Sequence, residues 1–158
     1  MRLTPDLWIQ VYDLIETYGR LLDEDKLEDW LDLFAEDCRY EIVSRENRDQ
    51  QLPLSLMLCD NKDMLRDRIY SLREANIYNI HSDCHVVGLV RATQAPPAPI
   101  AASAAYSLFQ SNQEGDSRLF SVGRYYLDLV EQERDLRILR QIVVVDTGAI
   151  PTLLATPI

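Results

Sequence analysis

The chain has 158 residues, 47% of them hydrophobic, and a formal net charge of −10. This length fits a single domain over residues 1–158, and the hydrophobic fraction is large enough to bury one core. The excess of 26 acidic over 16 basic residues argues against nucleic acid or an anionic membrane surface as the main partner, because phosphate binding needs a basic surface. The acidity is typical of a soluble protein and also compatible with a partner whose surface is basic.

The cysteine content and the hydropathy pattern predict a cytoplasmic protein. The three cysteines, Cys38, Cys59 and Cys84, form no Cys-x-x-Cys pair, which favours reduced thiols over a disulfide scaffold. The first residues contain no uninterrupted apolar run of the kind found in signal peptides. No apolar run approaches the roughly 18 residues that cross a bilayer.

The first third of the chain is predicted to be helical and then to change to strand. A helix is expected to begin at Thr4, which suits an N-cap, with Pro5 at the first helical position. A second helix is expected to begin at Asp25, with Glu28 completing a capping-box-like signature. This helix carries an apolar face with the helical period: Leu27, Trp30, Leu31 and Phe34. A strand is expected over about 39–43, followed by an exposed loop over residues 44–51.

The remaining elements predict an α+β fold. A strand is expected over Leu54–Cys59, then a third helix capped by Asp60 or Asn61 and carrying Met64, Leu65, Ile69 and Leu72. Strands are expected over 86–90, 100–110, 118–130 and 136–146, with Pro-rich residues 95–99 as a hairpin connection and Gly123 as a bulge. Because helices come first and strands joined by short turns follow, we expect an antiparallel meander packed against helices.

The two histidines, His81 and His85, are the obvious candidates for a metal site. On an extended chain four residues span about 13 Å, too far for both imidazoles to reach one ion at about 2 Å. Tight looping around Asp83 would bring them together. The interpretation that the residues favour is an ordinary polar role for both histidines.

An acid–base site in a pocket is a second hypothesis. His85, oriented by a carboxylate such as Asp37 or Asp83, could move a proton near neutral pH. Four tyrosines could supply hydroxyl groups, or could instead be core aromatics: Tyr12, Tyr18, Tyr106 and Tyr126. The sequence contains no Gly-x-Ser-x-Gly and no Gly-rich phosphate loop, so no nucleophile motif is recognised.

Several strings occur in order along most of the chain and together resemble one family. They are Asp25-x-Leu27-Glu28-x-Trp30, Phe34-x-x-Asp37-Cys38-x-Tyr40, Arg45-Glu46-Asn47, Met57-x-Cys59-Asp60, Asp63-Met64-Leu65-x-Asp67-Arg68-Ile69, Leu72-Arg73-Glu74-Ala75-Asn76-Ile77-Tyr78, Gly123-x-Tyr125-x-x-Asp128 and Leu153-Leu154-Ala155-Thr156-Pro157. The chain thereby resembles the small (β) subunit of Rieske-type aromatic-ring-hydroxylating dioxygenases. Within that family it is similar to the branch that acts on aromatic carboxylates.

The resemblance implies a fold, partners and a division of labour. It implies a cystatin-like, nuclear-transport-factor-2-like (NTF2-like) cone of helices and curved, mostly antiparallel sheet. It implies a trimer of small subunits that carries three large subunits in an α3β3 complex. The large subunit would hold the Rieske [2Fe–2S] cluster and the mononuclear Fe(II), and this chain would hold no cofactor. Consistent with this, the sequence has no Cys-x-His…Cys-x-x-His and only two histidines.

The family branch tends to carry arginines around its two histidines, whereas this chain has none between His81 and His85. Any contact that those arginines make with a large subunit must therefore be built differently here. Five residues are predicted to form part of a partner interface: Arg66, Arg68, Arg73, Tyr78 and His81. A solvated, salt-bridged helix face is the alternative for the arginines.

Three functional hypotheses follow. The first is a non-catalytic structural subunit of a multicomponent oxygenase that hydroxylates an aromatic, carboxylated ring. The second is a stand-alone pocket enzyme, a dehydratase or isomerase, that uses His85 and Asp37. The third is a binding module of the same fold without chemistry.

Overall fold

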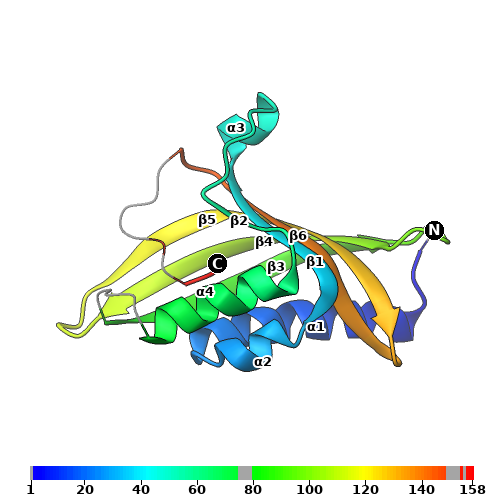
Figure 1. The fold of residues 1–158 in the computed structure, drawn as a ribbon, viewed down its shortest axis with the longest axis horizontal. Coiled ribbons are helices and arrows are strands. Elements are labelled where there is room, and N and C mark those ends of the chain that lie inside the picture. The colour runs from blue at the N-terminus through cyan, green and yellow to red at the C-terminus, as the bar shows by residue number, and fades with distance from the viewer. Residues whose placement is uncertain (1, 75–79, 149–153, 155) are drawn as a thin grey trace.

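The computed structural model describes residues 2–74, 80–148, 154 and 156–158. A six-stranded, twisted sheet carries helices against one of its faces (Figure 1). The strands, in chain order, are β1 (Phe34–Ser44), β2 (Met57–Cys59), β3 (His81–Thr93), β4 (Ile100–Asn112), β5 (Ser117–Gln132) and β6 (Asp135–Val145). The helices are α1 (Pro5–Asp23), α2 (Leu27–Leu31), α3 (Arg45–Asp49) and α4 (Lys62–Glu74).

The sheet has the order β2-β1-β6-β5-β4-β3. Strands β3 to β6 form the expected antiparallel meander, and β1 joins β6 in parallel. Helix α1 packs on β3, and α4 packs on β1. This arrangement confirms the α+β, NTF2-like cone with a mostly antiparallel sheet.

The first helix begins as the sequence predicts. The Thr4 hydroxyl oxygen accepts a hydrogen bond from the Leu7 N–H at 3.3 Å, and Pro5 occupies the first turn. The third predicted helix is α4, and Asn61 is its cap, because its side-chain oxygen accepts from the Met64 N–H at 2.9 Å. Local capping chemistry was therefore sufficient to place both helix starts.

The predicted capping box at Asp25 is wrong. Helix α2 begins at Leu27, and Lys26 at its N-cap makes no side-chain cap. Asp25 has φ 56° and lies outside the helix. Its carboxylate and that of Glu28 instead accept hydrogen bonds from Arg73 of α4, at 2.6 and 3.1 Å. The two carboxylates that were expected to cap the helix are therefore bound by the Arg73 guanidinium instead.

Several boundaries also differ from the sequence-based expectations. Phe34 opens β1 rather than closing the second helix, and the expected loop over residues 44–51 contains α3, capped by the Ser44 hydroxyl. Strand β2 is limited to three residues, and β3 already begins at His81. These ends depend on pairing with distant strands, which sequence periodicity does not report.

Gly123 is not a bulge. It pairs with Val145 and Tyr106 within regular ladders, and the register shifts of β5 lie at Leu108/Phe109 and Asp128/Leu129. A Cβ atom at Gly123 would lie 1.9 Å from the main-chain oxygen of Val144. Glycine is needed at this position because the two backbones approach each other closely.

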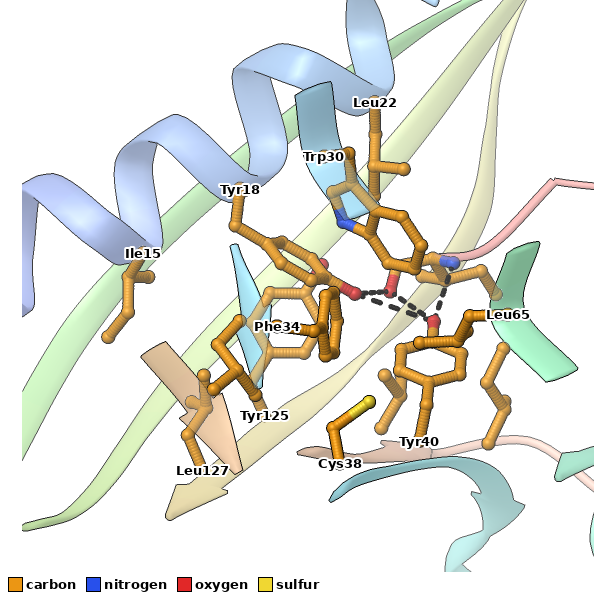
Figure 2. Packing of buried hydrophobic residues seen from close by; sticks show 14 of the residues in the cluster. Ile15, Tyr18, Leu22, Trp30, Phe34, Cys38, Tyr40, Leu65, Tyr125 and Leu127 are labelled. Carbon is orange, nitrogen blue, oxygen red and sulfur yellow. Dashed lines mark hydrogen bonds between the residues drawn. The ribbon is translucent and has the colours of Figure 1, made fainter. Parts of the chain in front are cut away.

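The core fills the space between the helices and the inner face of the sheet. Its largest fully buried side chains are aromatic and come from α1, α2, β1 and β5: Tyr18, Trp30, Phe34, Tyr40 and Tyr125 (Figure 2). The Trp30 and Phe34 rings meet edge to face at 4.8 Å, and Trp30 and Tyr40 do so at 5.6 Å. Such edge-to-face pairs stabilise packing beyond the area they bury.

Candidate functional site

The two histidines lie four residues apart on the extended strand β3. The strand pairs with β4 without a register shift from His81 to Gly88, so no tight loop forms around Asp83. The His81 Nε2 lies 3.3 Å from an Asp83 carboxylate oxygen. His85 is buried, with 1% of its side chain exposed, and makes its own carboxylate contact elsewhere.

The carboxylate that orients His85 is Asp23, the last residue of α1. Its oxygen lies 2.5 Å from the His85 Nδ1, and its other oxygen accepts from the His85 main-chain N–H at 2.8 Å. Gly19, one turn earlier, allows this approach, since a Cβ atom added there would lie only 3.3 Å from the His85 Cβ. The Asp23–His85 pair therefore fastens the end of α1 to β3.

Asp37 does not take part in this pair. It lies exposed on β1, whereas His85 is buried against α1. Burial raises the pKa of Asp83 above its ordinary value, and the proximity of His81 and His85 offsets only part of this rise. Sequence reasoning missed Asp23, because nothing local links the end of a helix to a strand 62 residues later.

The interior of the cone is occupied by the chain itself. Ile158 is 1% exposed and lies among the core aromatics. Its main-chain oxygen accepts hydrogen bonds from the hydroxyls of Tyr18, at 2.5 Å, and Tyr40, at 3.0 Å (Figure 2). Its N–H donates to the Tyr40 hydroxyl at 3.1 Å. Ile158 is therefore part of the buried core.

The four tyrosines of the acid–base hypothesis do not converge on one site. Tyr12 is exposed on α1, and Tyr126 lies under the Arg48 guanidinium at 4.1 Å. Tyr18 is committed to Ile158, and the Tyr106 hydroxyl lies 2.8 Å from the Ser121 hydroxyl. Burial raises the pKa of Tyr18 well above its ordinary value and that of Tyr106 to about 12. These hydroxyls stay protonated at neutral pH and do not act as bases there.

Iron ligands of the Rieske or facial-triad type do not fit this chain. The described residues contain no group of three or more His, Cys, Asp or Glu side chains placed to hold a metal ion. Cys38 and Cys59 are buried, and burial raises the pKa of the Cys38 thiol to about 11, which disfavours the thiolate that ligates iron. The full sequence has only two histidines, one of them bound to Asp23.

The residues predicted to contact a partner already have intramolecular contacts where they are described. Arg66 pairs with Asp63, and Arg68 lies near the Cys59 thiol and lowers its pKa against the larger effect of burial. Arg73 bridges α4 to Asp25 and Glu28. His81 contacts Asp83, and Tyr78 lies outside the described residues. The partner role of these residues stays a prediction.

The fold is thus an NTF2-like cone with a core of its own side chains, and Asp23 and His85 form its one histidine–carboxylate pair between α1 and β3 among the described residues. The family model "Ring hydroxylating beta subunit" matches residues 19–152. The chain therefore belongs to the β-subunit family of aromatic-ring-hydroxylating dioxygenases. It is a small subunit of such a multicomponent enzyme, and the oxygenase activity belongs to the complex.

Relatives cover nearly the whole chain. The anthranilate 1,2-dioxygenase small subunit of Burkholderia cepacia is 40% identical over 99% of this chain and 98% of its own length. A β subunit of the Comamonas sp. terephthalate 1,2-dioxygenase terminal oxygenase component is 31% identical, over 95% and 97%. A solved structure from Novosphingobium aromaticivorans DSM 12444, assigned as an aromatic-ring-hydroxylating dioxygenase β subunit, superimposes with a TM-score of 0.85 at 38% identity, covering 94% of this chain and 95% of its own.

None of the described helices is long and apolar enough to cross a membrane.

Proposed function

We propose that this chain is a non-catalytic, structural small subunit in a cytoplasmic complex with a large oxygenase subunit of α3β3 composition. The large subunit carries the Rieske [2Fe–2S] cluster and the mononuclear Fe(II), and the small subunits form a trimer beneath it. The observation that carries the structural role is the filled core, where the main-chain oxygen of Ile158 accepts hydrogen bonds from the hydroxyls of Tyr18 and Tyr40.

The substrate of the complex is proposed to be an aromatic carboxylate. The relatives that support this are named for anthranilate and terephthalate, both of which are carboxylated rings. The ring itself would be selected in the large subunit, where the oxygen-activating iron lies. The small subunit contributes by holding the large subunits in their assembled geometry.

The proposal is tested by producing the chain alone and together with a large oxygenase subunit from the same organism. We expect the chain alone to contain no stoichiometric iron and to show no visible charge-transfer bands. We expect the co-produced complex to contain both iron centres and to hydroxylate aromatic carboxylates when its reductase is supplied. Stoichiometric iron in the isolated chain, or a fully active large subunit that never binds it, would refute the proposal.

A further inference from the structure

Strand β3 forms one edge of the sheet. It is the last strand in the order β2-β1-β6-β5-β4-β3, and among the described strands it pairs with β4 alone. Its other side therefore presents main-chain N–H and C=O groups to which another extended chain can add. A groove of about 360 Å³ lies between α1 and β3 and is lined by Val86, Val87 and Val90 of the strand. The helix thus leaves room beside this edge.

The middle of β3 has the composition of a segment that pairs readily with other chains. Residues 86–90 read Val-Val-Gly-Leu-Val and contain neither a charged residue nor a proline. The side chains of Val86 and Leu89 are 57% and 79% exposed. Uncharged, β-forming segments at an open edge promote addition of strands from other chains, and folded proteins usually carry a feature that prevents it.

The first such feature is the carboxylate of Asp23. The His85 main-chain N–H donates to both oxygens of this carboxylate, at 2.8 and 3.1 Å, so it points away from β4 toward the open edge. Pairing with β4 is regular from His81 to Gly88, and main-chain groups alternate in direction, so those of Val87 point the same way. Asp23 thereby occupies a donor that an added strand would need.

The second feature is a bulge at Leu89–Val90. From Gly88 to Arg91, β3 advances three residues, from 88 to 91, while β4 advances two, from 105 to 103, so β3 carries one extra residue. Leu89 has φ 51°, in the left-handed region that large side chains rarely adopt. A bulge bends and twists its strand, so the straight register that an added strand requires is lost there.

We propose that the Asp23 carboxylate and the Leu89–Val90 bulge protect the open edge of β3 against strand addition by another copy of the chain. Between the two features Val87 is the one residue whose main-chain groups point outward. A single residue is too short for a stable strand pair. The inference goes beyond the proposed function, because it gives Asp23 a role besides contacting the His85 imidazole and excludes this edge from assembly.

Removing each feature separately tests the proposal in the complete chain. Asp23→Ala removes the carboxylate, and deletion of Leu89 restores one-to-one pairing between β3 and β4. The control for the first variant is His85→Ala, which loses the imidazole contact but keeps the main-chain N–H that Asp23 accepts. The control for the second is Leu89→Gly, which keeps the bulge because glycine readily adopts a positive φ. Circular dichroism verifies that each variant is folded, and either variant with its control decides the question if the other does not fold.

Sedimentation velocity and amide hydrogen exchange give the outcome. We expect Asp23→Ala and the Leu89 deletion each to increase the fraction of chains in species larger than the native assembly by at least about threefold, and both controls to match the native chain. In the larger species the amides of residues 83–87 should exchange more slowly than in the native chain, because they are paired. Native size distributions for both variants overturn the inference. So do larger species without slower exchange in β3, or a His85→Ala chain that associates as strongly as Asp23→Ala.

Discussion

Ile158 connects the hydroxyls of Tyr18 on α1 and Tyr40 on β1. Its side chain lies in the aromatic core, and its main chain makes three hydrogen bonds with two tyrosine hydroxyls. These hydroxyls are donors held in an apolar site, so an unpaired one would be costly. The contact therefore fills part of the core and pairs the hydroxyls of Tyr18 and Tyr40.

Replacing Ile158 by alanine is expected to lower the free energy of unfolding by about 2–4 kcal/mol, because it leaves a cavity in a packed core. Tyr40→Phe, which removes the hydroxyl and keeps the ring, is expected to cost about 1 kcal/mol or somewhat more. Urea unfolding of the isolated chain measures both. A cost near zero for Ile158→Ala would mean that the segment does not occupy the cone in solution.

Asp83 is predicted to oppose folding at neutral pH. Burial raises its pKa from the ordinary 3.8, so the folded state holds a proton more tightly than the unfolded state does. Its contribution is therefore most favourable below the ordinary pKa and is lost as pH rises toward the folded value. We expect Asp83→Asn to unfold at a higher temperature than the native chain at pH 7. The difference is expected to shrink as pH falls below 4, as a series of thermal melts would show. A gain that grows on acidification would contradict this sign.

At the scale of elements, Arg73 ties α4 to the start of α2. Its guanidinium donates to the carboxylates of Asp25 and Glu28 and to the main-chain oxygen of Asp25, at 2.6 to 3.1 Å. The Arg73 side chain is 29% exposed, whereas the Arg66–Asp63 pair on the same helix is far more open to solvent. Shielded, multidentate pairs contribute more than exposed single ones.

Arg73→Met is expected to destabilise the chain by about 1–2 kcal/mol, and Arg66→Met by about 0.5 kcal/mol or less. Chemical denaturation of the two variants under identical salt conditions compares them directly. Equal effects would show that the Arg73 bridge is no more than a surface ion pair.

Gly123 controls how closely β5 can approach β6. An alanine there would place its Cβ against the Val144 main-chain oxygen, which cannot move without breaking the ladder. Gly123→Ala is expected to cost about 3 kcal/mol or more. Gly88→Ala is the control, because a Cβ at Gly88 meets nothing within 4 Å, and it is expected to change stability little. Comparable unfolding midpoints for the two variants would contradict the close approach.

The elements that sequence reasoning placed correctly are those specified locally. Thr4 and Asn61 cap the helices that follow them within three residues, and the alternation after Ile100 gives β4. What it missed depends on distant partners. Arg73 donates a hydrogen bond to the Asp25 carboxylate, which was expected to cap α2. The Asp23 carboxylate, rather than Asp37 or Asp83, contacts the imidazole of His85. Ile158 meets Tyr40 across 118 residues, and no local pattern encodes such a contact.

At the scale of the whole molecule, the core is filled by the chain's own aromatic side chains and by Ile158. The family of β subunits to which the chain belongs accounts for that design. The Asp23–His85 pair, which resembles an acid–base pair in composition, serves to fasten α1 to the sheet. A loss of that pair should therefore disturb stability or assembly and leave the chemistry unaffected.

Turnover per iron, measured in complexes of verified subunit stoichiometry, tests this central claim most directly. Complexes carrying His85→Ala or Asp37→Asn are compared with the native complex. The structural role predicts that the yield of intact His85→Ala complex falls while turnover per iron stays within about twofold, because the lost group performs no proton transfer. An intact complex whose turnover per iron falls by roughly 100-fold, the scale of a lost general acid or base, would contradict it.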